Sequence, residues 1–203
     1  MNVPRTIGVA AVALCMFAAG MVHAQSRSWV RGTVVSLQGD QLAVKSRDGR
    51  DLTIRLAPNA GVRAAKAITL ADIKPGDLVG PASRKREDGS LVAISLQLFP
   101  PERRGAIPEG HFPWDLEPGA MMTNATITGV VQATGGRELT LEYKGGAQKI
   151  VVPEGIPMFT TVPGDRSLLV SGAYVSLGAQ VGADGALSAA AVTVSKDGVR
   201  PAN

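Results

Sequence analysis

The sequence predicts an all-β protein built from two tandem five-stranded barrels with an ordered, proline-rich connector between them. Three observations lead to this fold class. Apolar and polar residues alternate in short segments, glycine-containing turns separate these segments, and the whole pattern occurs twice along the chain. A period of two residues is typical of a strand with one buried face and one solvated face.

The first 24 residues have the features of a secretory signal peptide. Arg5 precedes an uncharged run from 7 to 22, and Val22-His23-Ala24 supplies small residues before an expected cut between Ala24 and Gln25. The apolar run is shorter than the roughly 20 residues that a spanning helix needs. We therefore expect a periplasmic or secreted protein with no membrane span after cleavage, with a retained anchor as the alternative.

Alternation is clearest in three segments, at 52–56, 94–98 and 139–143. Between such segments the chain carries dipeptides that adopt positive φ at low cost, and these favour hairpin turns. The expected turns are Gly39-Asp40, Asp48-Gly49, Asp88-Gly89, Gly135-Gly136, Gly145-Gly146 and Asp184-Gly185.

The segment that starts at Val30 aligns with the segment that starts at Ile127, so that Gly32 matches Gly129 and Leu42 matches Leu139. A match at one constant spacing indicates an internal repeat. Each copy covers about 70 residues and about five strands. The expected domains are a first barrel at 25–99, a connector at 100–123 and a second barrel at 124–203.

The region after the third strand of each copy defines the type of barrel. In the first copy Thr69 can cap a single helical turn that runs to Asp72, and Pro75-Gly76 ends this turn before the next strand. Five strands with a short helical turn after the third is the order of an OB-fold, a partly open Greek-key barrel. We therefore expect two OB-like barrels, and a sandwich made of all ten strands is the alternative.

The motifs "PGDLV" at Pro75 and "DGSLVAISL" at Asp88 resemble those of an exported bacterial domain family of unknown function, whose members are predicted to form OB-like barrels. The resemblance covers both copies, although "SGAYV" at Ser171 replaces the first motif in the second copy. It rests on turn and core positions. It therefore implies the fold and transfers no functional residue.

The composition excludes several classes of function. Cys15 leaves with the signal peptide, so the mature chain has no thiol, and His111 is its one histidine. Without a recognisable nucleophile or acid–base pair, we expect no enzyme. Strand interiors offer only Tyr143 and Tyr174 for base stacking, with Trp29 at the entry of the first strand. Since we also expect the protein to be exported, we expect no nucleic-acid binding.

The connector is both stiff and apolar. Its five prolines, Pro100, Pro101, Pro108, Pro113 and Pro118, disfavour regular structure. A plain linker would carry polar residues with these prolines, whereas this one carries Ile107, Phe112, Trp114 and Leu116. We expect the connector to pack between the barrels with Trp114 as its anchor, and we read Arg103 and Arg104 as solvated charges.

The alternative for the connector is a soft-metal site. Neutral imidazole and thioether sulfur suit Cu(I), so His111, Met121 and Met122 would be the ligands, and Trp114 would cover the metal. This set resembles the periplasmic copper carriers, which are small OB-like barrels with one histidine, two methionines and a tryptophan. Those carriers place their ligands on barrel strands, with one residue between the methionines. Here Met121 and Met122 are adjacent, and Met158 could replace one of them.

These observations favour an exported, non-catalytic binding or adaptor protein of the bacterial cell envelope. Its ligand is not fixed by the sequence, and a periplasmic Cu(I)-binding protein is the alternative. An envelope protein could also bind through an exposed strand edge, because such pairing uses only main-chain groups.

Overall fold

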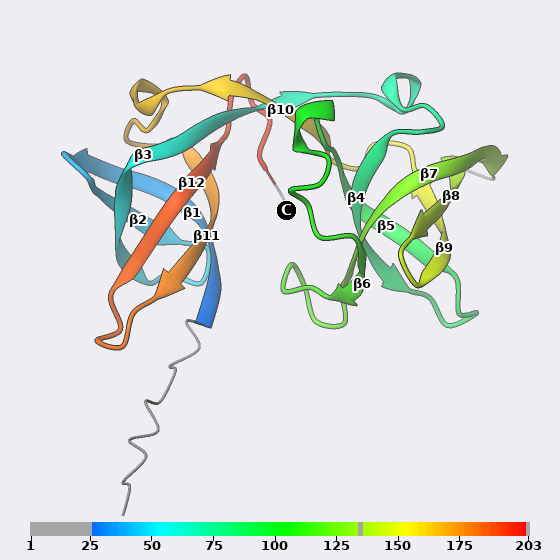
Figure 1. The fold of residues 1–203 in the computed structure, drawn as a ribbon, viewed down its shortest axis with the longest axis horizontal. Helices are drawn as coiled ribbons and strands as arrows, with labels where there is room; N and C mark the ends of the chain where they lie inside the picture. The colour runs from blue at the N-terminus through cyan, green and yellow to red at the C-terminus, as the bar shows by residue number, and fades with distance from the viewer. Residues whose placement is uncertain (1–25, 134–135, 202–203) are drawn as a thin grey trace, which may run out of the picture.

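The computed structural model describes residues 26–133 and 136–201, and the expected signal peptide lies outside these residues. The described part of the chain is all-β, with twelve strands, three short 3-10 helices and no α-helix. Figure 1 shows the strands gathered into two lobes that lie side by side.

Lobe 1 is a closed five-stranded barrel. Each strand pairs with two neighbours in the circuit β1–β2–β3–β12–β11, and the antiparallel pairing of β11 with β1 completes it. The contact between β3 and β12 is the one parallel pairing in this circuit. The strands are β1 (Ser26–Gln38), β2 (Gln41–Ser46), β3 (Asp51–Ala67), β11 (Tyr174–Val181) and β12 (Leu187–Val194).

Lobe 2 contains five further strands joined in a circuit of the same order, β7–β8–β9–β5–β4. Here β5 and β9 form the parallel contact, through Leu91 with Ile150 and Val92 with Val151. The strands are β4 (Leu78–Lys85), β5 (Leu91–Leu98), β7 (Met121–Ala133), β8 (Gly136–Tyr143) and β9 (Gly146–Pro153).

Each lobe has its own apolar core, filled by the inward-facing residues of its strands. Burial of side chains such as these contributes about 1.5–3 kcal/mol each. The core of lobe 1 is centred on Val34, Leu42, Val44, Ile54, Leu56, Val175 and Leu177. The core of lobe 2 is centred on Val79, Leu96, Ile127, Leu139, Leu141, Ile150 and Val152.

A two-stranded ribbon joins the lobes. β3 continues for 17 residues, which corresponds to roughly 55 Å of extended chain. Its C-terminal part leaves lobe 1 and pairs antiparallel with β10 (Met158–Gly164), from Val62–Gly164 to Ala67–Phe159. Figure 1 shows this ribbon crossing the top of the molecule. Because both strands carry the chain from one lobe to the other, the strands that follow them enter the opposite lobe.

Two 3-10 helices occupy the ends of the ribbon. The helix η1 (Leu70–Asp72) follows β3, and the side chain of Asp72 accepts hydrogen bonds from the backbone N–H and the hydroxyl of Thr69, at 2.8 and 2.9 Å. This matches the helical turn predicted from the sequence. The helix η3 (Arg166–Leu168) follows β10 and precedes β11.

The expected arrangement of one complete barrel in each sequence copy is not confirmed. Lobe 1 combines β1–β3 from the first copy with β11 and β12 from the second, whereas lobe 2 combines β4 and β5 with β7–β9. The last two strands of each copy have therefore changed places, and the expected boundaries at 25–99 and 124–203 cut through both circuits. The two cores are separate, which also differs from a single ten-stranded sandwich.

The turn predictions are confirmed where the structure describes them. Gly49, for example, has φ 87°, and the turn places the backbone N–H of Ser46 2.8 Å from the carbonyl oxygen of Arg50. Positive φ also occurs at the predicted turns at Gly39, Gly89, Gly145 and Gly185, whereas residue 135 lies outside the described residues. In the described part of the chain, no helix is long and apolar enough to cross a membrane.

The strand exchange predicts that the two halves stay together when the connector is cut. A protease recognition sequence inserted after Gly105, an exposed turn residue with φ 78°, allows specific cleavage there. We expect the two fragments to elute together on native size-exclusion chromatography and to separate only in denaturant, because each fragment supplies strands to both cores. Two folded fragments that elute separately would contradict the exchange.

Candidate functional site

The connector contacts both lobes. It begins with the 3-10 helix η2 (Pro101–Arg103) and continues to β6 (Gly110–Pro113), which pairs antiparallel with β7 of lobe 2. The next residues, 114–116, lie against β1 and the β2–β3 hairpin of lobe 1. In Figure 1 the connector accordingly occupies the space between the lobes.

A cluster of aromatic rings around a buried arginine attaches the connector to lobe 1. The rings of Trp114 and Trp29 meet edge to face with centroids 4.9 Å apart, and Phe112 lies 6.2 Å from Trp114 in the same manner. The guanidinium carbon of Arg31 lies 5.7 Å from the Trp29 centroid and 5.4 Å from that of Trp114. A guanidinium that lies over two indole rings gains cation–π stabilisation, most strongly when it is shielded from water.

Arg31 is 3% exposed, although it carries a charge. Its Nη1 donates a hydrogen bond of 2.8 Å to Asp115, whose side chain is about half exposed. Its Nε and Nη2, and Nε1 of Trp114, are buried without a hydrogen-bond partner among the described residues. Because unpaired buried donors are costly, the ring contacts and the Asp115 ion pair must offset this cost.

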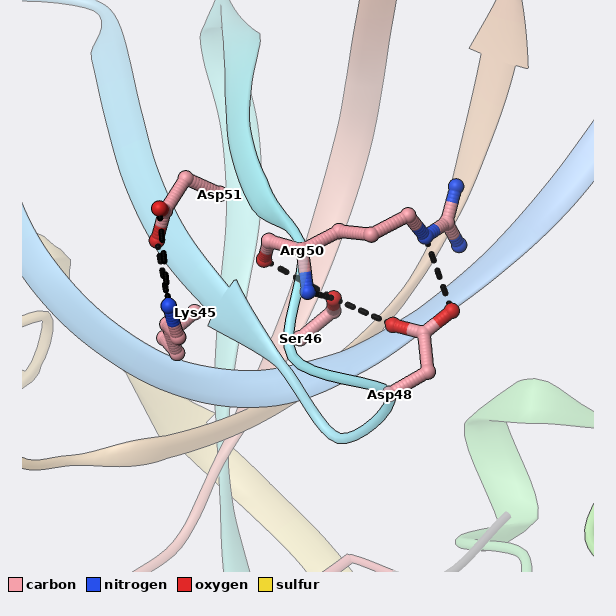
Figure 2. A network of polar contacts seen from close by, with 5 residues as sticks. All are labelled: Lys45, Ser46, Asp48, Arg50 and Asp51. Atoms are coloured by element: carbon pink, nitrogen blue, oxygen red, sulfur yellow. Dashed lines mark hydrogen bonds and ion pairs between the residues drawn. The ribbon is translucent and has the colours of Figure 1, made fainter.

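Arg47 adds a second attachment from the β2–β3 hairpin. Its guanidinium donates to the carbonyl oxygen of Leu116 at 2.8 Å and to that of Asp115. The hairpin is held in shape by the hydroxyl of Ser46, which donates to Asp48 at 2.5 Å (Figure 2). The ion pair between Arg50 Nε and Asp48, at 2.8 Å, completes this network. The hydrogen bond from Ser46 lowers the pKa of Asp48 below its ordinary value, and the hydrogen bond from Arg50 adds a further lowering.

A cleft of about 410 Å³ lies between the two lobes, with the connector as one wall. Lobe 1 contributes residues of β1, β11 and β12, and lobe 2 contributes residues of β5 and β7. The volume falls in the range of small-molecule sites, which are concave and largely apolar with a few polar groups. The aromatic side chains that line the cleft are Trp29, Phe99, Phe112 and Trp114.

A second hollow, of about 540 Å³, lies on lobe 1. It is lined by glutamines, small residues, Leu56, Asp40 and Arg55, and it has no aromatic side chain among the described residues. Aromatic rings provide the large rigid contact area on which recognition usually depends. The cleft between the lobes is therefore the better candidate for the functional site.

The structure does not bring the three predicted metal ligands together. His111 pairs with Thr123 across β6 and β7, and Met121 lies two residues before Thr123 on the same face. Met122 points to the opposite face, because side chains alternate along a strand. It is 3% exposed and lines the cleft beside Phe112. This register places His111 and Met121 on one face of the β6–β7 pair and Met122 on the other.

The remaining predicted residues have other neighbours. Met158 lies on β10 and packs against the core of lobe 2. Trp114 lines the cleft and contacts Trp29, Phe112 and Arg31, as described above. No group of three or more histidine, cysteine, aspartate or glutamate side chains is placed to hold a metal ion within the described residues.

His111 is partly buried, and its Nδ1 lies 2.8 Å from the hydroxyl oxygen of Thr123. Burial lowers the pKa of His111 below its ordinary value of 6.5, because the imidazolium loses hydration. The folded protein therefore favours the neutral ring at neutral pH.

Sequence reasoning missed most residues of the cleft. Arg103 was expected to be a solvated charge, yet it lines the cleft, whereas Arg104 donates to the carbonyl oxygen of Gly76. Trp29 was noted only as the entry of the first strand. The one available signal was that neither tryptophan has a place in an expected barrel core, because Trp29 stands at the entry of the first expected strand and Trp114 lies in the connector.

Comparison with protein-family models, with curated proteins and with solved structures found no match to this chain. The functional argument therefore depends on the site itself.

The Arg31–Asp115 contact predicts an asymmetric mutational response. We expect Asp115→Asn to lower the free energy of unfolding by about 1–3 kcal/mol, because it leaves the buried Arg31 charge without its partner; this is less than for a fully buried pair, since Asp115 is half exposed. Arg31→Met in the Asp115→Asn background should recover part of this loss. Urea unfolding measures both changes.

The exposed pair Lys45–Asp51 provides the control, because Asp51→Asn should change stability by less than about 0.5 kcal/mol. Equal losses for Asp115→Asn and Asp51→Asn would contradict the role given to Arg31.

His111 predicts a specific pH dependence. Its pKa is lower in the folded than in the unfolded chain, so its contribution to stability is full above about pH 6.5 and is lost as the pH falls through the folded-state pKa. Proton NMR of the chain without residues 1–24 follows this single histidine directly. A folded-state pKa at or above that measured in urea would contradict the burial argument.

Proposed function

We propose that this chain is an exported, non-catalytic binding protein of the bacterial cell envelope, and that it holds its ligand in the cleft between the lobes. The observation that carries the proposal is the cleft itself, of about 410 Å³ with four aromatic side chains. A ligand there would contact both lobes and the connector together.

The chemistry of the lining supports binding over catalysis. Thr161, Ser176 and Thr193 offer hydroxyl groups, but the described lining includes no histidine, aspartate or glutamate that would activate them as nucleophiles. Gln97 and Asn124 add amide groups suited to orienting a ligand. Such a combination recognises a ligand without a group positioned to move a proton.

The fold also supports a proposal about how the two lobes arose from the two sequence copies. The strand order of both circuits and the 3-10 helix after β3 favour two OB-like barrels that exchanged their last two strands. In this arrangement the connector segment is an ordered wall of the binding site. The sequence copies then supply matching scaffolds, and the connector supplies the part of the site that occurs only once.

Two substitutions, each replacing an alanine of β12 with phenylalanine, test the proposed function. Ala191 and Ala190 are both exposed, but only Ala191 lines the cleft. We expect N-phenyl-1-naphthylamine, a neutral fluorescent probe, to bind the wild-type protein with micromolar affinity. Ala191→Phe should weaken this binding at least about tenfold because the new ring fills part of the cleft, whereas Ala190→Phe should leave it unchanged. Equal effects of both substitutions, or no binding of either this probe or its sulfonate analogue 1-anilinonaphthalene-8-sulfonate, would overturn the proposal.

A further inference from the structure

We infer that the ligand of the cleft is a small organic anion, with a carboxylate, sulfonate or phosphate group attached to an apolar body. This inference deepens the proposed function and rests on it. It follows from the distribution of charge in the cleft, from the way one arginine is placed there and from the volume available.

The cleft carries charge of one sign. Arg27 of β1, Arg63 of β3 and Arg103 of η2 line it, and none of the lining residues that the structure describes is acidic. None of these three guanidinium groups forms an ion pair with a described residue. Cations in a concave, partly apolar site focus a positive potential there, and an anion relieves their repulsion.

Arg63 and Arg103 are half-buried, so water compensates their charges less well than on an open surface. A guanidinium matches the planar fork of a carboxylate or the oxygens of a sulfonate or phosphate, and such charge-assisted hydrogen bonds are among the strongest in proteins. These two side chains therefore define the most favourable position for an anionic group.

Arg27 reaches the cleft because the neighbouring strand carries a glycine. On β11, Gly178 pairs with Trp29, and a Cβ atom at Gly178 would lie 3.3 Å from Cδ of Arg27. The stem of Arg27 therefore lies across the bare backbone of Gly178. A Cβ atom at position 178 would require this side chain to shift by a few tenths of an ångström.

The apolar part of the ligand has matching surfaces. The four aromatic side chains offer rings to a body of similar character. A cleft of about 410 Å³ takes a molecule of drug-like size, whereas a protein partner needs roughly 800 Å² of surface on each side. The volume therefore favours a small amphiphilic anion over an acidic protein segment.

Two fluorescent probes with the same aromatic core test the inference on the full mature chain. 1-Anilinonaphthalene-8-sulfonate carries a sulfonate, and N-phenyl-1-naphthylamine is its neutral counterpart. We expect the sulfonate probe to bind at least about tenfold more tightly at low salt, and this advantage should shrink in 0.5 M NaCl because ions screen the guanidinium groups.

Arginine substitutions locate the anionic group. Arg63→Gln should weaken binding of the sulfonate probe about tenfold and leave the neutral probe unchanged. Arg55→Gln, on the same strand but outside the cleft, should affect neither probe. Arg103→Gln, on η2 outside the barrel strands, repeats the test if Arg63→Gln fails to fold, and thermal melts by circular dichroism check folding of every variant.

The outcomes separate this inference from the proposed function. Equal affinity for the two probes, or equal effects of Arg63→Gln and Arg55→Gln, would overturn the inference that the ligand is an anion. The proposed binding cleft would then stand for a neutral ligand, provided that Ala191→Phe still blocks binding. If neither probe binds the wild-type protein, both the anion and the proposed function are overturned. A displacement experiment with the bound sulfonate probe separates small ligands from protein segments. If acidic peptides displace the probe and decanoate does not, the inference of a small-molecule ligand is overturned.

Discussion

The antiparallel ribbon of β3 and β10 is the constraint on which the rest of the structure depends. Once β3 extends beyond lobe 1, its next strand can only enter lobe 2, and β10 returns the chain in the same way. This crossing makes β12 the partner of β3 and β5 the partner of β9, so each parallel contact joins strands from different sequence copies. The paired segments of the ribbon are equivalent in the two sequence copies, so their contact resembles the self-complementary interface of a symmetric dimer.

The connector breaks this symmetry, since it occurs once. It joins the edge of lobe 2 through β6 and is attached to lobe 1 by the rings around Arg31. The polar contacts of Arg31 and Arg47 would contribute little alone on an exposed surface, but here they accompany burial of aromatic area. The two lobes and the connector thereby enclose a cleft that neither lobe could form alone.

The strands and turns were predictable because they depend on local chemistry. Alternation at 52–56 and the Asp48-Gly49 turn report backbone preferences that hold in any barrel. The strand exchange was not predictable, because both copies carry similar inward-facing residues and either partner satisfies them. The cleft residues depend on this exchange, so Arg27, Arg63 and Trp29 gave no sign that they would meet. His111 and Met122 lie on opposite faces of the β6–β7 pair, and this placement depends on strand β6, which the sequence did not predict.

The exchange of strands also sets the order in which the molecule can be completed as it emerges from synthesis. The circuit of lobe 2 lacks its last member until β9 ends at residue 153, and lobe 1 waits for β12 near residue 194, although its first strand begins at residue 26. The three-stranded meander of β1, β2 and β3 must therefore persist with unpaired edges while most of the chain is made. Such distant pairings are formed slowly, and open edges favour association with other chains. A chaperone that holds the unfinished chain would therefore aid folding of this topology more than folding of two self-contained barrels.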